Sequence, residues 1–135
     1  MEELIESIKR HEGLRLKPYV CTQGKTSIGY GRNLADVGIS KAEAEMMLKT
    51  DIARIVCEFY KLPLPVIKNC NKARRRVLCE MVFQLGLGGV LKFKRMLSAI
   101  EQSNFGLASI EMIDSKWYDQ TPNRVEELAE IIRRG

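Results

Sequence analysis

The chain has 135 residues, of which 45% are hydrophobic and 29% are charged, and its net charge is +5 at pH 7. This length suits one domain with a real core and is too short for two independent domains. No apolar run approaches the roughly 18 residues that span a bilayer, and the chain opens with acidic residues, so neither a membrane anchor nor a signal peptide is expected.

The positive charge favours an anionic partner, which leaves nucleic acid, acidic lipids and an anionic cell wall as alternatives. The four cysteines show neither C-x-x-C spacing nor nearby histidines, so a zinc site or a thioredoxin-like site is disfavoured. Most of them lie beside apolar residues, which predicts free thiols made in a reducing compartment. They are Cys21, Cys57, Cys70 and Cys79.

In chain order, the apolar spacing and the charge order predict a first helix over residues 2–11, stopped by Gly13. Residues 17–31 carry the only β pattern, with a turn at Gly24. The segment Ser40–Glu43 reads as a capping box, and the helix behind it continues until Pro63 and Pro65.

Four further helices are predicted in the second half of the chain. One is capped by Asn71 and ends at Gly86–Gly89; the next carries Val90, Phe93, Leu97 and Ile100; a short one covers Ala108–Lys116; and the last follows the N-cap and first-turn proline of Thr121-Pro122 to Gly135. The prediction is a mainly helical α+β protein in which a small hairpin lobe is attached to a helical bundle.

Two charged residues stand out as candidates for chemistry. Glu12 lies where the first helix gives way to Gly13, so it can project into a cleft, although a surface role is the plain alternative. Arg124 lies in the first turn of the last helix, where the helix dipole disfavours a cation. That position suggests a carboxylate partner elsewhere in the fold, unless the guanidinium is simply solvated.

Cys21 follows Glu12 by nine positions and has hydroxyl side chains nearby, among them Ser27. A cysteine in a strand is commonly an inert apolar residue, but a thiolate would be a nucleophile or a base. A Cys21–His11 peptidase dyad is a further alternative, disfavoured because no third orienting residue is evident.

Three blocks carry a resemblance to a known family. The first runs from His11 to Gly31, the second is Met81–Gly86, and the third is Trp117–Arg124. Together they closely resemble the phage lysozymes (endolysins) of glycoside hydrolase family 24, the T-even coliphage type. The family pattern is Glu, eight residues, Asp or Cys, five residues, Thr; Glu12 and Cys21 match it, and Ser27 replaces the usual threonine.

The resemblance implies a single lysozyme-like catalytic domain over residues 1–135. Its hairpin lobe would cover about 13–40, a long connecting helix about 41–61, and a helical lobe 70–135 together with the N-terminal helix. The active-site cleft would lie between the lobes.

The implied activity is hydrolysis of the β-1,4 bond between N-acetylmuramic acid and N-acetylglucosamine in peptidoglycan. Glu12 would be the general acid and Arg124 would orient it. Cys21 would either attack the anomeric carbon or, as a thiolate, assist a water held by Ser27; the stereochemical outcome stays open. No cofactor or metal is implied.

The resemblance also suggests substrate contacts. Phe83 would stack on a sugar ring and Gln84 would bond an acetamido group, although Phe83 is equally compatible with the core. Asn33, Met96 and Glu111 align with cleft positions but differ from the family in residue type. Arg32 occupies the position at which the family commonly has a histidine, so an ion pair made by that histidine is not assumed for this chain.

As an endolysin, the protein would be a monomer that accumulates in the host cytoplasm until a holin releases it to the periplasm and cell wall. Two other functions stay open. One is a catalytically inactive relative that binds peptidoglycan, prompted by Cys21 and Ser27. The other is a nucleic-acid-binding helical protein, prompted by the basic residues Lys72, Arg74, Arg75 and Arg76.

Overall fold

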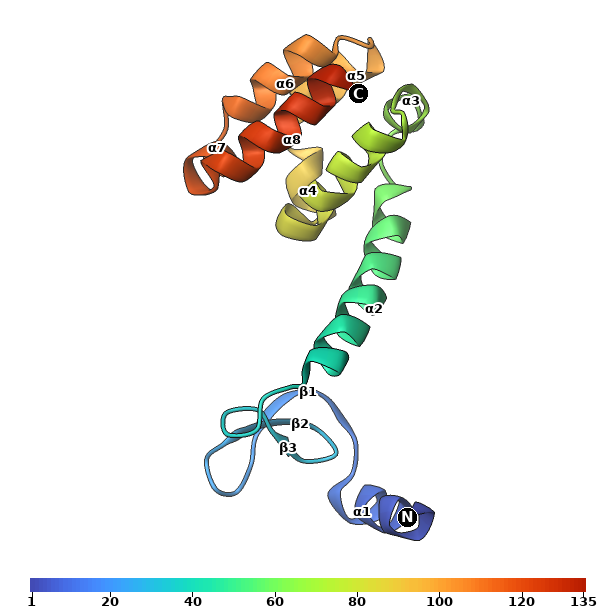
Figure 1. Cartoon of the computed structure of the whole chain (residues 1–135), viewed down its shortest axis with the longest axis vertical. Coiled ribbons are helices and arrows are strands. Elements are labelled where there is room, and N and C mark those ends of the chain that lie inside the picture. The colour runs from blue at the N-terminus through green and yellow to red at the C-terminus, as the bar shows by residue number, and fades with distance from the viewer. The chain divides into compact units, whose positions relative to one another are not determined.

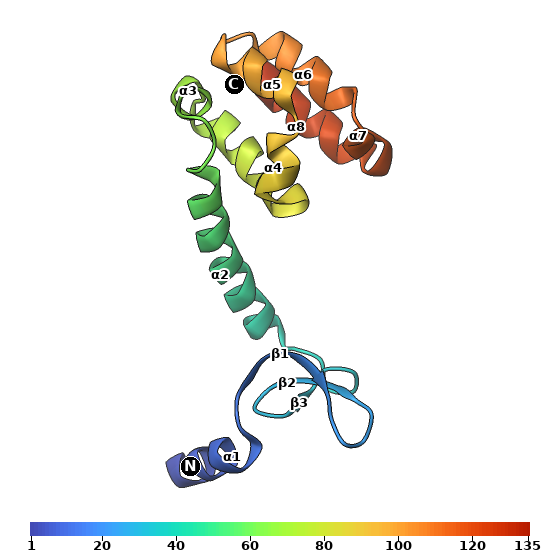
Figure 2. The same cartoon turned by 180° about the vertical axis from the view of Figure 1, so that it is seen from behind.

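The computed structural model describes all residues, 1–135, and they form two compact units, Met1–Leu48 and Lys49–Gly135. Figures 1 and 2 show the helices and strands of each unit from opposite sides. A three-stranded antiparallel sheet near the N-terminus is followed by helices, so the mainly helical α+β class is confirmed. None of the helices combines the length and the apolar character needed to cross a membrane.

The first unit begins with α1 (Glu2–Glu12), which Gly13 ends with a φ of +71°. Acidic residues occupy its first turn and basic residues its last, as the dipole favours. The predicted hairpin is confirmed by β1 (Arg15–Val20) and β2 (Thr26–Gly29), although β1 begins two residues earlier than predicted. A third strand that was not predicted, β3 (Arg32–Asn33), completes the sheet in the order β1-β2-β3.

The pairing of the strands positions Ser27 at the centre of the sheet, opposite Tyr19 of β1 and Asn33 of β3. The register of β1 shifts between Arg15 and Tyr19. Pro18 lies in this interval and has no N–H to donate, which is tolerated because β1 is an edge strand. Ser27 is 2% exposed and is the one residue of this unit that is buried.

The predicted capping box is confirmed at the start of α2 (Lys41–Phe59). The backbone N–H of Glu43 donates to the Ser40 hydroxyl at 3.1 Å, and the Ser40 N–H donates to the Glu43 carboxylate at 3.1 Å. Arg32 forms an ion pair with the same carboxylate at 2.7 Å. One side chain therefore ties β3 to the first turn of α2.

The second unit holds the hydrophobic core, and α6 and α8 lie side by side in it (Figures 1 and 2). Its largest fully buried side chains include Leu78, Met81, Met96, Ile100 and Ile132. Its remaining helices are α3 (Leu64–Asn69), α4 (Lys72–Leu91), α5 (Lys94–Glu101), α6 (Phe105–Ile113), α7 (Lys116–Gln120) and α8 (Pro122–Arg134).

Helix α3 was not predicted, because Pro63 and Pro65 were interpreted only as stop signals. In the structure Pro63 is the N-cap and Pro65 lies in the first turn, where proline needs no hydrogen-bond donor. The predicted stop at Gly86 is confirmed by its φ of +75°, but a helical segment to Leu91 follows directly within α4. The next helix consequently begins at Lys94 rather than near Val90.

The predicted helix Ala108–Lys116 has different bounds, because α6 starts at Phe105 behind its cap Asn104 and ends before Lys116. Thr121 occupies the predicted N-cap of α8, but its side chain does not bond to the helix. Its hydroxyl donates instead to the carbonyl of Trp117 at 3.3 Å. All four cysteines are free, as predicted.

Candidate active site

Glu12 is the last residue of α1, and its carboxylate lies against the turn between β2 and β3. A Cβ atom at Gly31 would approach Glu12 Oε2 to 3.1 Å. Gly31 has a φ of +82°, which an L side chain rarely adopts. The backbone of the turn thus approaches the carboxylate at a position where glycine is the only comfortable residue.

Cys21 lies at the start of the turn between β1 and β2. Its N–H donates to the Lys25 carbonyl at 2.9 Å, and its own carbonyl accepts from the N–H of Gly24 at 2.9 Å. The backbone N–H of Lys25 beside the sulfur lowers the pKa of the Cys21 thiol, with smaller contributions from the N–H of Gln23 and the Ser27 hydroxyl. Hydrogen bonds to the charged form favour the thiolate.

Ser27 lies on the second strand of the hairpin, where it pairs with Tyr19, and Cys21 directly follows the first strand. The Ser27 hydroxyl donates to the Lys25 carbonyl at 3.3 Å, and this carbonyl competes with the Cys21 sulfur for the single hydroxyl proton. His11 does not support a peptidase dyad, because its ring nitrogen Nδ1 bonds to the Ser7 carbonyl of its own helix at 2.8 Å.

Arg124 has the carboxylate partner that its position suggested. Its guanidinium lies 3.7 Å from Glu80 of α4, and Arg76 lies 3.9 Å from the same carboxylate. Glu80 was missed in the sequence because the contact joins two helices that lie far apart along the chain. The pairing of Arg124 with Glu12 stays a prediction.

Phe83 and Gln84 are neighbours on α4, one turn before the break at Gly86. The side chain of Phe83 is 50% exposed, so the alternative that it belongs to the core is wrong. Gln84 donates from Nε2 to the Thr121 hydroxyl at 3.3 Å. Its buried carbonyl oxygen and the buried indole nitrogen of Trp117 have no hydrogen-bond partner.

Two of the aligned cleft residues line one groove of about 600 Å³ in the helical unit. Met96 is fully buried and forms part of the groove's wall, and Glu111 lies on its rim. Asn33 belongs to the N-terminal unit, where its side chain is bonded to Asp36 by two hydrogen bonds of 3.0 Å.

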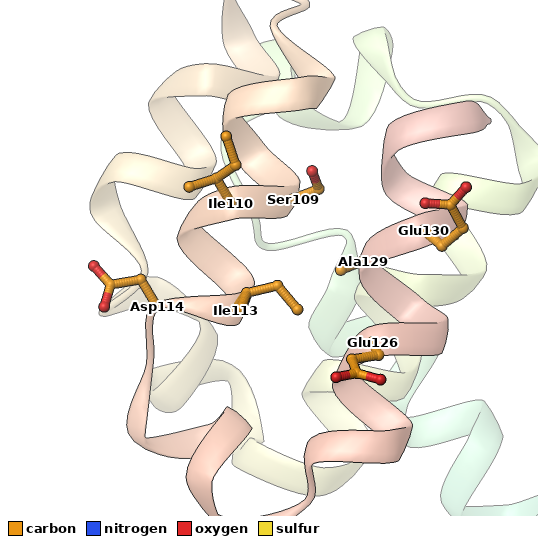
Figure 3. A pocket seen from close by; sticks show the side chains of 7 residues that line it. All are labelled: Ser109, Ile110, Ile113, Asp114, Glu126, Ala129 and Glu130. Atoms are coloured by element: carbon orange, nitrogen blue, oxygen red, sulfur yellow. The ribbon is translucent and has the colours of Figure 1, made fainter.

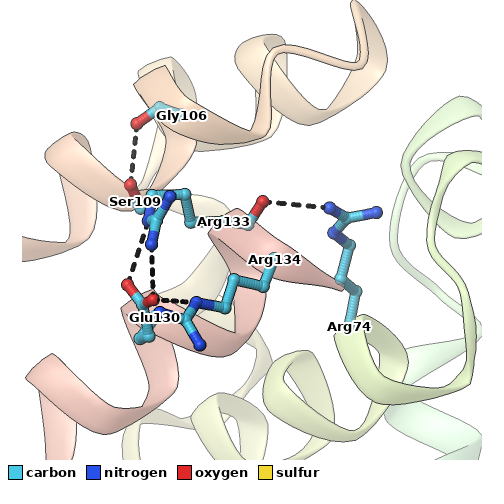
Figure 4. Close-up of polar contacts among 6 residues, drawn as sticks. All are labelled: Arg74, Gly106, Ser109, Glu130, Arg133 and Arg134. Atoms are coloured by element: carbon cyan, nitrogen blue, oxygen red, sulfur yellow. Dashed lines mark hydrogen bonds and ion pairs between the residues drawn. The ribbon is translucent and has the colours of Figure 1, made fainter.

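The basic run at the start of α4 has a structural use. Arg74 donates from Nη2 to the Arg133 carbonyl at 3.3 Å (Figure 4). It also donates from Nε to the Ile132 carbonyl at 2.7 Å, and the two bonds cap the end of α8. Arg75 donates to the carbonyls of Cys70 and Ile67 at 3.0 Å each. Two of the four cations proposed to bind nucleic acid are therefore engaged with the backbone.

A second groove, of about 570 Å³, lies between α6 and α8 (Figure 3). Ile110, Ile113 and Ala129 form its apolar part, and three carboxylates surround them. Tyr118 donates to one of these at 2.8 Å, and Arg133 and Arg134 pair with Glu130 (Figure 4). None of the predicted site residues lines this groove.

Comparisons with known proteins agree with the family resemblance. The family model described as phage lysozyme matches residues 9–134. The chain is 32% identical, over 98% of its length, to the pre-baseplate central spike protein Gp5 of Enterobacteria phage T4, of which it covers only 28%.

Two other relatives are covered over most of their length. The probable T4-type lysozyme 1 of Dictyostelium discoideum is 28% identical, with 96% of this chain and 93% of that protein aligned. The endolysin of Acyrthosiphon pisum secondary endosymbiont phage 1 is 33% identical, with 82% of this chain and 73% of that protein aligned. A family model that covers nearly the whole chain, a lysozyme-like fold and these relatives together show that the chain belongs to the phage lysozyme family.

Proposed function

We propose that the protein is a muramidase that hydrolyses the β-1,4 bond between N-acetylmuramic acid and N-acetylglucosamine of peptidoglycan. Membership of the phage lysozyme family supports this reaction, and so does the similarity to an endolysin. In this role it would lyse a bacterial host, with a holin giving it access from the host cytoplasm to the wall, and it would act as a monomer.

The observation that carries the proposal is the position of Glu12. Glu12 is exposed at the end of α1, and its carboxylate stands against Gly31, which has no side chain to cover it. A general acid must reach the glycosidic oxygen directly, so this open placement suits proton donation. Arg124 is proposed to orient the acid.

Cys21 would supply the second group that glycosidases of this kind need. A thiol with a lowered pKa is more often a thiolate near neutral pH, which suits either attack on the anomeric carbon or activation of a water. Ser27 would help to position that water by accepting a hydrogen bond, since the Lys25 carbonyl and the Cys21 sulfur compete for its own proton.

For substrate contacts, Phe83 offers half of its side-chain surface to solvent, as a stacking platform for a sugar ring requires. Gln84 is proposed to bond an acetamido group. Met96 and Glu111 would contact the substrate in the groove that they line. Asn33 would contact it through its backbone and through its side-chain amide, which is bonded to Asp36.

The test is Glu12→Gln, which removes the transferable proton and keeps the shape of the side chain. We expect loss of clearing of outer-membrane-permeabilised Gram-negative cells and loss of reducing-end release, by at least about 100-fold. Glu3→Gln, at the other end of the same helix, is the matched control and should behave as the parent. Equal lysis by Glu12→Gln and the parent would refute the acid assignment.

The thiol is tested separately. Cys21→Asp should retain activity, whereas Cys21→Ala should lose most of it, and full activity in Cys21→Ala would leave the thiol a packing role. Mass spectrometry of the released fragments identifies the reaction, because reducing muramic acid marks hydrolysis and an anhydro end marks transglycosylation.

A second candidate is a relative that binds peptidoglycan without cleaving it. The observation that favours it is the environment of Ser27, which is buried and whose proton is already bonded. In that case the parent would bind sacculi but release no reducing ends. The nucleic-acid function is disfavoured because the backbone already engages Arg74 and Arg75.

A further inference from the structure

Helix α4 presents a line of polar side chains to the start of α8. Arg76, Glu80 and Gln84 recur every four residues, so they lie along one side of the helix. Gln84 donates to the Thr121 hydroxyl at 3.3 Å. One turn earlier on α4, the Glu80 carboxylate lies 3.7 Å from the Arg124 guanidinium. Two successive contacts thus connect α4 to the start of α8, and one of them involves the arginine that is proposed to orient the acid.

The backbones that carry this contact are fixed by the core. Val77 and Met81 lie on either side of Glu80 in α4, Val125 follows Arg124 in α8, and all three are fully buried. Close packing around these side chains leaves little freedom to the two helix backbones. The guanidinium itself stands on a long side chain with many rotamers. Its position therefore depends on the group that it contacts.

The start of α8 has a surplus of positive charge. Its first turn contains no acidic residue, and the side chain of the N-cap Thr121 does not bond to the helix. The free N–H groups of that turn and the Arg124 cation repel each other. Glu80 is the one carboxylate of the unit Lys49–Gly135 within 4.0 Å of Arg124, and it offsets this charge from a neighbouring helix. Arg76 lies 3.9 Å from the same carboxylate.

The length of the contact identifies it as an ion pair that acts through charge. A separation of 3.7 Å exceeds the range of an ordinary hydrogen bond. The side chains of Arg124 and Glu80 are 40% and 39% exposed, so water does not surround either of them completely. Only Nη2 of the guanidinium makes the contact. A guanidinium has five N–H donors in a planar fork, so the others can serve a second carboxylate.

We infer that Glu80 is a positioning residue, which holds one edge of the Arg124 guanidinium so that its remaining donors are presented to the catalytic carboxylate. The inference rests on the proposed function, in which Glu12 is the acid and Arg124 orients it. It adds to that function a residue that acts on the reaction only through Arg124. Loss of Glu80 should therefore lower kcat and leave KM unchanged.

The kinetic test is Glu80→Gln, which removes the charge and keeps the shape of the side chain. With solubilised peptidoglycan strands we expect kcat to fall about threefold at an unchanged KM. The thermal midpoint should stay within about 2 °C of the parent, because the pair is partly exposed. Glu130→Gln is the matched control, since that carboxylate also pairs with two arginines, Arg133 and Arg134. It should keep the kcat of the parent.

A double-mutant cycle shows whether Glu80 acts through Arg124. Arg124→Gln alone should lower kcat by at least about tenfold, because the acid loses its partner. Adding Glu80→Gln to that variant should lower kcat no further, since the group that it positions is already absent. An unchanged kcat in Glu80→Gln, or a further threefold fall in the double variant, overturns the inference.

Nuclear magnetic resonance of the arginine Nε–H groups tests the contact without turnover. The Arg124 signal is the one that disappears in Arg124→Gln. Its relaxation should report an ordered group in the parent and in Glu130→Gln, and faster local motion in Glu80→Gln. Equal motion in the parent and in Glu80→Gln overturns the inference.

Failure of the proposed function has a different result. A parent that releases no reducing ends refutes the muramidase, and the relaxation data then still decide whether Glu80 holds Arg124. Normal hydrolysis by the parent together with an unchanged kcat in Glu80→Gln refutes the role of Glu80 alone.

Discussion

Gly31 matters because the carboxylate of Glu12 occupies the space that a side chain at this position would need. The contact of 3.1 Å from an added Cβ to Oε2 is tighter than ordinary van der Waals contact. Gly24 has a similar φ of +78°, yet an added Cβ there would meet nothing within 4 Å. The two glycines share a backbone strain and differ in what lies beside them.

We therefore predict that Gly31→Ala and Gly24→Ala lose similar stability, roughly 1–2 kcal/mol for a positive φ in an L residue. Only Gly31→Ala should lower kcat, by about tenfold, because it shifts the acid by a few tenths of an ångström. Thermal unfolding and reducing-end assays measure the two effects. An equal fall in kcat for both variants would contradict a specific contact with Glu12.

At this scale the sequence named candidate residues but not their surroundings. Glu12, Cys21 and Ser27 were identified from a local motif, and in the structure Glu12 ends α1 while Cys21 and Ser27 lie in the hairpin; their catalytic roles stay predictions. The ion pair of Arg124 with Glu80 and the burial of Ser27 depend on contacts between segments distant in sequence, which no local pattern encodes.

Among the elements, the start of α2 is notable for the carboxylate of Glu43, which has hydrogen-bond partners on several sides. Arg32 and then the N–H of Ser40 hold the pKa of Glu43 at about 2, below the ordinary value of 4.5. Because the folded-state pKa is lowered, the stabilisation is complete above the unfolded pKa near 4.5. It is lost as the pH falls through about 2.

Replacing this carboxylate by Glu43→Gln should lower the thermal midpoint at neutral pH, since the ion pair with Arg32 and the charged cap disappear. The difference from the parent should narrow as the pH is lowered from about 4.5 to 2. Glu45→Gln, on the same helix and without an ion pair, is the control. A difference that is constant across this range would contradict the assignment.

Arg74 joins three helices. Its guanidinium caps the last carbonyls of α8 and lies 3.4 Å from the centre of the Phe105 ring at the start of α6. A lysine keeps the charge but not the planar fork that reaches two carbonyls.

We predict that Arg74→Lys and Arg74→Met both destabilise the fold, by about 1–2 kcal/mol, because both lose the paired hydrogen bonds. Lys72→Met, two residues earlier on the same helix, should be nearly neutral. Denaturant unfolding gives the free energies. If Arg74→Lys were as stable as the parent, charge alone would explain this residue and the nucleic-acid function would regain support.

Elements with local signals were predicted well. The caps Ser40 and Asn71 act as expected because a cap uses only residues within one turn. Helix α3 and the segment after Gly86 were missed, since prolines and glycines end helices but also begin them. Which occurs depends on the buried contacts of residues such as Val66 and Val90.

Across the whole molecule the net charge is divided unevenly. The unit Met1–Leu48 carries 7 basic and 7 acidic side chains, and Lys49–Gly135 carries 15 basic and 10 acidic ones. The entire excess of +5 therefore belongs to the helical unit. Long-range attraction to an anionic wall should act through that unit.

Binding of the Glu12→Gln chain to isolated sacculi should weaken about tenfold between 50 and 300 mM salt, because screening shortens the reach of these charges. A pull-down at increasing salt measures this, with circular dichroism at each concentration to establish that the fold persists. If binding to sacculi did not depend on the salt concentration, apolar and hydrogen-bonding contacts rather than long-range charge would explain it.

The N-terminal unit has almost no buried side chains, and this affects the order in which parts of the protein unfold. Ser27 alone is buried there, whereas the core lies entirely within Lys49–Gly135. Amide protons of the strands should therefore exchange with solvent early, through excursions that leave the helices closed. The residues proposed for catalysis would then belong to the part of the chain that fluctuates most, and a bound glycan would slow its exchange.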